Sequence, residues 1–254
     1  MSGPLAPGGT SVSALTVYDT VAPDGLAGGS PHLHAVATEA YLVTAGAGEL
    51  HTIDADGFRS TPLEAGATVW FSPGVVHRAV NLGGLEVRVV MSHAGLPEAG
   101  DAVLTFPDAV LADPRRYAEA AALPGPQAAP SERLEAALRR RDLAVAGYRE
   151  LFVDTAHGRV VSPEALARLR TRAAALVAPR IDAWRQVAAA TVDRVAAETA
   201  ARLDALARGE LAALADARVT VPATEHAYGM CGVLQKEAPP HDTHPTDLTP
   251  GGSR

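Results

Sequence analysis

Two histidines and a glutamate stand close together near the start of the chain, at spacings that could hold a metal ion. In the stretch PHLHAVATEAYLVTAG (31–46), His32 and His34 are one residue apart, and Glu39 follows five residues after the second histidine. Alternate residues of a β-strand face the same side, so both imidazoles would lie on one face of a strand. Glu39 has the opposite parity, and it joins them only if the chain turns or bulges at AVAT (35–38).

A second stretch supplies a fourth candidate ligand. GATVWFSPGVVHRAVN (66–81) ends a strand in a Ser-Pro-Gly turn and places His77 on the strand that follows. Neutral imidazoles favour Fe, Ni, Cu or Zn, one carboxylate offsets one of the two charges, and an octahedral ion keeps positions open for water or substrate. The cofactor that we expect is therefore one divalent transition metal, Fe, Mn, Ni or Zn. The predicted ligands are His32, His34, Glu39 and His77.

The first half of the chain reads as a set of short strands. Apolar runs such as LTVYDTV, AYLVTA, ATVWFS and LEVRVVMSH are separated by glycine pairs and prolines. Strands of this length and spacing are typical of an all-β sandwich or barrel. The Asp-Gly turn of DADG (54–57) follows the strand ELHTI, so antiparallel pairing is expected.

The second half reads as helices. Asp113 and Pro114 open a short helix that ends at the linker PGPQAAP (124–130), and Ser131 and Ser162 are the predicted N-caps of the next two helices. Pro179 should end or kink the second of these, and a longer helix with an apolar stripe follows over roughly 180–216. The predicted domain organisation is a β-barrel over 1–110, a short helix and linker over 111–130, a helical region over 131–236 and a disordered tail over 237–254.

The histidine stretches resemble the two sequence motifs of the cupin superfamily. The first motif, His-x-His, three or four residues, Glu, six residues, Gly, fits His32, His34, Glu39 and Gly46. The second motif, Gly, five residues, Pro-x-Gly-x-x-His, three residues, Asn, fits Gly66, Gly74, His77 and Asn81. Leu26 stands where the first motif expects a glycine, and Ser72 stands where the second expects a proline. The resemblance spans about residues 28–93 and implies a mainly β, antiparallel jelly-roll barrel with one metal inside.

Two further residues are candidates for catalysis. His93 continues the parity of the inward-facing row Val87, Val89 and Met91, which predicts either a proton shuttle at the barrel mouth or a plain histidine at a strand end. Tyr41 shares the parity of Glu39, so its hydroxyl either reaches the pocket or lies in the core.

Other polar residues carry weaker signals. His51 lies on a strand whose inward side the sequence does not define. Cys231 has His226, His241 and His244 around it, but no Cys-x-x-Cys accompanies them, so a second metal site is not expected there.

Composition restricts the function classes. The formal net charge of -7 disfavours nucleic acid as a partner. The first residues lack a signal peptide, and no apolar run is long enough to span a membrane, so a cytoplasmic protein is expected. The interpretation is a metal-dependent enzyme on a small polar metabolite, with either oxygenase or isomerase/cyclase chemistry. The alternative is a non-catalytic small-molecule sensor. The apolar stripe of the last helix packs against either the barrel or a second subunit, and a homo-oligomer, namely a dimer, is expected.

Overall fold

The alternating apolar runs of the first half form a large antiparallel sheet. The computed structural model describes residues 6–156, 158–215, 217 and 219–238. A 3-10 turn, η1 (Pro7–Gly9), precedes seven strands. They are β1 (Ser11–Val17), β2 (His32–His34), β3 (Glu39–Asp54), β4 (Gly57–Glu64), β5 (Thr68–Phe71), β6 (Val76–Met91) and β7 (Ala102–Leu104).

Two long strands organise the sheet. β3 and β6 pair antiparallel from Glu39 opposite Met91 to Ile53 opposite Val76, and the register shifts between Val43 and Gly48. Such bulges bend a pair of strands, so β3 and β6 run through both layers of the fold. The predicted Asp-Gly hairpin is present, because Asp54 pairs with Gly57 at the start of β4.

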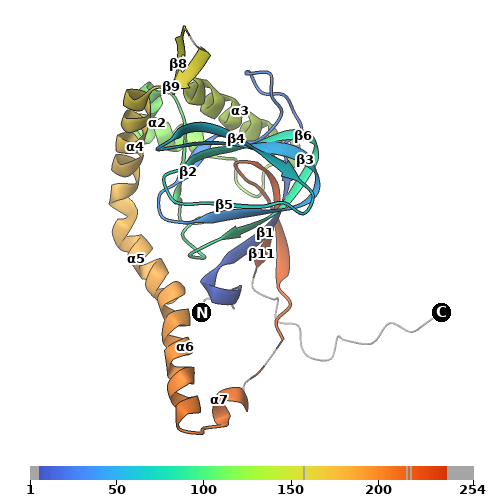
Figure 1. The fold of residues 1–254 in the computed structure, drawn as a ribbon, viewed down its shortest axis with the longest axis vertical. Coiled ribbons are helices and arrows are strands. Elements are labelled where there is room, and N and C mark those ends of the chain that lie inside the picture. Colours follow the sequence, from blue (N-terminus) through green and yellow to red (C-terminus); the bar gives the residue numbers. More distant parts are fainter. Residues whose placement is uncertain (1–5, 157, 216, 218, 239–254) are drawn as a thin grey trace, which may run out of the picture.

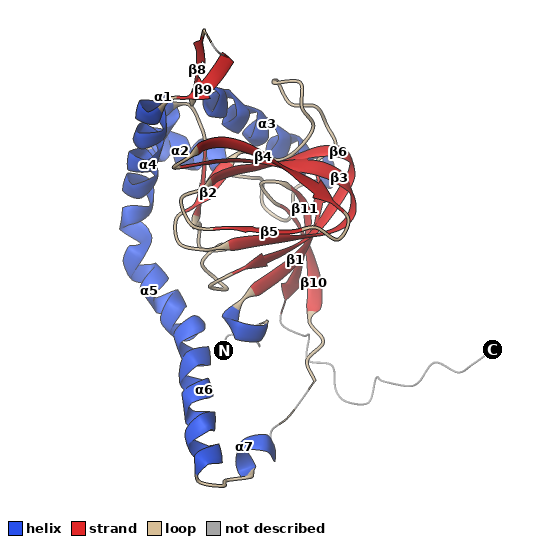
Figure 2. Ribbon diagram, in the orientation of Figure 1, coloured by secondary structure: helices blue, strands red, loops and turns tan. Residues whose placement is uncertain are grey.

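The antiparallel architecture predicted from the sequence is confirmed, but the sheet is not a closed barrel. Its hydrogen-bonded order is β10-β11-β1-β6-β2-β7, and β4 and β5 branch from β3. Among the described residues β4 and β5 pair with β3 alone, so these edges stay open. Figure 2 shows the strands curving over one another, and among the described residues no ladder closes them into a barrel.

Helices follow the sheet and cover one side of it. They are α1 (Asp108–Leu111), α2 (Pro114–Ala121), α3 (Pro130–Arg149), α4 (Pro163–Val177), η2 (Ala178–Arg180), α5 (Ile181–Ala190), α6 (Val192–Ala207) and α7 (Ala212–Ala215). Figure 1 shows α4, α5 and α6 following one another in a column beside the strands and extending past them. No helix among the described residues is long and apolar enough to cross a membrane.

The helix boundaries test the predicted caps. The Asp113 carboxylate accepts hydrogen bonds from the Arg115 and Arg116 amides, and the Ser162 hydroxyl accepts one from the Ala165 amide, so both N-caps are confirmed. Ser131 is not an N-cap, because α3 begins one residue earlier at Pro130, whose missing N–H suits the first turn. The predicted long helix over 180–216 is broken at Thr191, where ψ of -86° leaves the helical region.

The predicted helical region 131–236 also contains strands, and this is a correction. A two-stranded hairpin, β8 (Phe152–Thr155) and β9 (Gly158–Val161), separates α3 from α4, and the chain later forms β10 (Ala223–Tyr228) and β11 (Gly232–Ala238). β11 pairs with β1, from Ser13 opposite Lys236 to Val17 opposite Gly232. The edge of β1 needs hydrogen-bond partners, and a distant segment supplies them. The first two residues of the predicted tail 237–254 belong to β11, and the rest, from 239 onward, lies outside the described residues.

Candidate metal centre

Strand pairing brings together the four predicted ligands. His32 on β2 lies opposite His77 on β6 in the antiparallel register, and Glu39 is the first residue of β3. The four side chains are all buried, and one potential ligand atom from each lies within 4.8 Å of the others. The sequence therefore predicted a cluster that the fold assembles, including the turn at residues 35–38 that brings Glu39 to the histidines.

Hydrogen bonds at Nδ1 set the orientation of all three imidazoles. The Ser30 carbonyl accepts from His32 Nδ1 at 2.8 Å, and the Val75 carbonyl accepts from His77 Nδ1 at 3.1 Å. The third ring donates from His34 Nδ1 to Asp101 Oδ2 at 3.1 Å. A carbonyl or carboxylate oxygen only accepts, so each Nδ1 carries a proton and Nε2 is the ring nitrogen that remains for a metal.

The atoms at the centre lack satisfactory partners of their own. Glu39 Oε2 lies 3.2 Å from His34 Nε2 and 3.1 Å from His77 Nε2. Even so, Glu39 Oε2 and His77 Nε2 are buried without a hydrogen bond of good geometry among the described residues. Buried polar atoms without partners are costly, and a cation among these lone pairs would satisfy them. Three imidazole nitrogens and one carboxylate oxygen fit a first-row divalent ion.

The pKa shifts of His32 and Glu39 favour the protonation states in which these residues bind a metal, a neutral imidazole and an ionised carboxylate. Burial, with His77 and His34 nearby, holds the pKa of His32 well below its usual value, so this imidazole is neutral. Burial alone would raise the pKa of Glu39, but the imidazoles of His34 and His77 outweigh it and keep the pKa low. Burial would likewise lower the pKa of His34, yet Asp101 and Glu39 raise it to about 9, so a metal that binds His34 Nε2 must displace a proton.

Asp101 is a site residue that the sequence analysis missed. It precedes β7, is fully buried, and accepts hydrogen bonds from the Val36 amide at 2.7 Å and the Ala37 amide at 3.0 Å, besides the one from His34. One carboxylate thus fixes both the His34 ring and the turn that carries Glu39 to the centre. Nothing in the local pattern marks it, because it lies 67 residues from His34.

A cavity of about 250 Å³ adjoins three of the four ligands, His32, His34 and Glu39. The three adjacent strands β1, β6 and β11 supply an apolar wall that includes Leu15, Val89 and Leu234. Pockets for drug-sized ligands measure roughly 300–1,000 Å³, so this one suits a smaller molecule.

The turn between β10 and β11 completes the wall of the cavity. Met230 and Cys231 line it, the Ser30 amide donates to the Met230 carbonyl at 2.8 Å, and the Tyr18 amide donates to the Cys231 carbonyl at 3.1 Å. The turn packs so closely on Gly29 that a Cβ there would lie 2.5 Å from Cys231 Cα. A segment about 200 residues away in sequence therefore builds part of the site.

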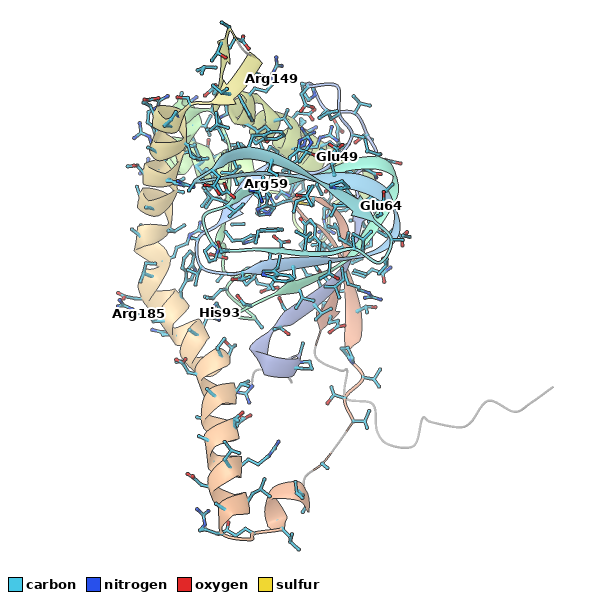
Figure 3. The ribbon with its side chains drawn as sticks, viewed as in Figure 1. Glu49, Arg59, Glu64, His93, Arg149 and Arg185 are labelled. Carbon is cyan, nitrogen blue, oxygen red and sulfur yellow. The ribbon has the colours of Figure 1, made fainter. Side chains whose placement is uncertain are left out.

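The structure does not bring His93 to this cavity. Val87, Val89 and Met91 face inward as the parity predicts, but β6 ends at Met91 and His93 adopts a left-handed conformation with φ of 59°. His93 is absent from the described residues that line the cavity, and Figure 3 shows it at the margin of the sheets. The alternation of side chains along β6 does not extend to His93, because the chain changes direction after the strand ends.

Tyr41 shares the inward face with Glu39, as predicted, and is fully buried. Its hydroxyl lies 3.5 Å from Cys231 Sγ, and it is absent from the described residues that line the cavity. Burial raises the pKa of Tyr41 well above its usual value and raises the pKa of Cys231 to about 12. Both groups are neutral, and a catalytic role for Tyr41 stays a prediction.

The remaining histidines lie elsewhere. His51 Nε2 is 3.0 Å from Glu49 Oε2, to which the Ser60 hydroxyl also donates, and these residues form a separate polar group on β3 and β4. Figure 3 shows Glu49 on that side of the sheet. His226 is exposed on β10, where its ring packs edge-on against Tyr228. His241 and His244 lie outside the described residues.

A comparison with protein families finds one match. Residues 17–93 match the model of a family described as the Cupin domain. No curated protein matches the chain.

Solved structures also match part of the chain. An uncharacterised conserved protein with a double-stranded β-helix domain from Klebsiella pneumoniae is 23% identical, with 35% of this chain and 70% of that chain covered and a TM-score of 0.27. An RmlC-like cupin protein from Desulfovibrio desulfuricans is 17% identical, covering 36% of this chain and 78% of that chain with a TM-score of 0.27. A TDP-fucose-3,4-ketoisomerase from Campylobacter jejuni is 9% identical, covering 35% and 64% with a TM-score of 0.30.

Proposed function

Residues 17–93 form a cupin domain, and from that premise we propose that the chain is a metal-dependent enzyme. It binds one divalent transition metal through His32, His34, Glu39 and His77 and acts on a small polar metabolite in the adjoining cavity. A metal bound there supplies Lewis-acid or one-electron chemistry at the coordination positions that the protein leaves open.

The arrangement of the lone pairs carries the proposal. Each Nδ1–H is held by an acceptor outside the cluster, so the three Nε2 atoms and Glu39 Oε2 are the groups available at its centre. A merely polar pocket would not need three oriented imidazoles with buried, unpartnered atoms among them.

Oxygenation is the reaction class that the cavity supports better. Isomerisation or cyclisation by proton transfer needs a general base within hydrogen-bond reach of the substrate. His93 and Tyr41, the two residues predicted for that role, do not line the cavity among the described residues, and the lining carboxylates other than Glu39, namely Glu98 and Glu237, are exposed. The strands β1, β6 and β11 instead place apolar side chains, among them Leu15, Val89 and Leu234, along the cavity beside the predicted metal ligands.

Metal analysis with a matched pair of histidine variants tests the metal site. We expect about one equivalent of metal in the purified wild-type chain, the same content in His51→Ala, and below about a tenth of an equivalent in His34→Ala. His51 is the control because it is a histidine of the same sheet outside the cluster. A folded His34→Ala chain with wild-type metal content would contradict the proposal.

Oxygen uptake tests the reaction class. Iron in the wild-type chain, with O₂ consumption that depends on an added small hydroxy or carboxylic acid, would support an oxygenase. Zn or Mn with substrate turnover and no O₂ consumption would favour isomerase or cyclase chemistry. A metal-loaded chain that binds such acids and converts none of them would favour the non-catalytic sensor.

A further inference from the structure

Arg140 on α3 is a cation without a carboxylate partner, and it lines the cavity beside the metal ligands. Its neighbours are paired: Arg139 lies 2.6 Å from Glu135 and Arg141 lies 2.8 Å from Asp142. Among the described residues no ion pair involves Arg140, so the middle member of three consecutive arginines is the exception.

The hydrogen bonds of Arg140 use only part of its donor capacity. One terminal nitrogen donates to the Gly229 carbonyl at 2.9 Å and the other to the Ala121 carbonyl at 3.3 Å. Its Nε is buried and has no hydrogen-bond partner among the described residues. A guanidinium has five N–H donors, so these two bonds leave about three of them for a ligand.

Burial makes the missing partner costly. Removal from water lowers the pKa of Arg140, and the nearby acidic groups that oppose this effect, Tyr18, Tyr117 and Cys231, are neutral at physiological pH. A desolvated cation gains most from an anion in hydrogen-bond contact, and Arg pairs with carboxylates in a two-pronged geometry.

A second cation lines the same cavity. Lys236, the only lysine in the chain, lies on β11 opposite Ser13 of β1. A divalent metal with three neutral histidines and the Glu39 carboxylate would add one net positive charge. The exposed Glu98 and Glu237 also line the cavity, and the Glu98 carboxylate accepts a hydrogen bond from the Gly95 amide at 3.1 Å.

We propose that the cavity selects a small carboxylic acid and that Arg140, with Lys236, binds its carboxylate. This proposal rests on the proposed function. When the carboxylate of the substrate is bound by Arg140, the opposite end of the molecule faces His32, His34 and Glu39. Arg140 lies on α3, outside residues 17–93, so the helical region contributes to the substrate preference, while the sheet supplies Lys236 and the metal site.

A pair of matched ligands tests this selection. Succinate and its neutral diamide, succinamide, have the same number of heavy atoms and differ in charge. Calorimetric titration of the full chain, both metal-loaded and metal-free, should show that succinate binds at least about tenfold more tightly than succinamide in both forms. Equal binding of the two ligands, or no binding of succinate, would overturn the proposal.

Variants separate a ligand role from a structural one. Arg140→Gln keeps an amide donor for the Gly229 carbonyl but removes the charge, and we expect the succinate preference to fall to within about twofold. Arg140→Lys should restore part of it. Arg139→Gln, on the exposed arginine next in sequence, should keep the wild-type preference.

The outcomes also separate this proposal from the metal site. A preference that appears only with metal and survives Arg140→Gln would mean that the carboxylate binds the metal instead, which overturns the role of Arg140 and leaves the metal proposal standing. An Arg140-dependent preference in a chain that binds no metal would support the role of Arg140 and contradict the metal proposal. If Arg140→Gln does not fold, Lys236→Gln decides: an unchanged preference in that variant overturns the proposal.

Discussion

Replacement of Asp101 by asparagine probes whether this carboxylate holds the metal ligands in place. Asp101 Oδ1 accepts from the Val36 amide, and Oδ2 accepts from both the Ala37 amide and His34 Nδ1. An asparagine amide has one oxygen, so its least disruptive orientation keeps the oxygen at the Oδ2 position. Its NH₂ group then faces the Val36 N–H, and this partly buried amide is left without its acceptor.

Two effects of Asp101→Asn can be estimated from these contacts. An unsatisfied buried donor costs about 1–3 kcal/mol of the free energy of unfolding. His34 then donates to a neutral oxygen in place of a carboxylate, and loss of such a partner behind a metal-binding histidine lowers metal affinity by about 10–100-fold. The affinity change corresponds to about 1.4–2.7 kcal/mol.

Competition with a chromophoric chelator measures the metal affinity, and urea unfolding of the metal-free chain measures stability. Asp113→Asn is the matched control, because Asp113 also accepts two backbone amides, but through the single oxygen Oδ1, which asparagine retains. We expect this control to leave both quantities near wild type. A folded Asp101→Asn chain with metal affinity within about twofold of wild type would refute the reasoning.

Three further predictions follow from the hairpin turn and the helical column. The pKa of Cys231 near 12 keeps its thiol protonated and buried, so alkylation at pH 8 should be roughly a thousandfold slower in the native chain than in urea; equal rates would contradict this. Gly29→Ala should cost about 1–3 kcal/mol in urea unfolding and accelerate that alkylation, because its Cβ collides with Cys231, whereas Gly125→Ala, with nothing near its Cβ, should change neither. The homodimer expected from the sequence gains a candidate surface in the exposed Leu203 and Leu206 of α6, so Leu203→Glu combined with Leu206→Glu should give monomers in light scattering; a monomeric wild type would refute the expectation.

Local periodicity predicted the core of the site. His32 and His34 share a face because side chains alternate along a strand, and Glu39 reaches them because the chain turns at residues 35–38. The spacing of the second motif placed His77 on a neighbouring strand. These are short-range properties, and the alternation of side chains every two residues is the same in the folded sheet as in the isolated strand pattern.

The same periodicity failed where a strand ended or where a partner came from far along the chain. His93 leaves the inward face because β6 stops at Met91, a boundary that parity alone does not reveal. The segment that forms β11 was assigned to the helical region, because its pairing with β1 is a contact across more than 200 residues.

Alternation and motif spacing are local, so the amino-acid sequence alone predicts an antiparallel sheet and four converging candidate ligands. The contact of Asp101 with His34, 67 residues away, and the bond of Arg140 to Gly229 beside the cavity, 89 residues away, follow from the fold. Packing sets such contacts, because a buried polar group is satisfied by whichever part of the chain the fold places beside it. The candidate metal ligands can therefore be predicted from the sequence, whereas the contacts of Asp101 and Arg140 with the site depend on the fold.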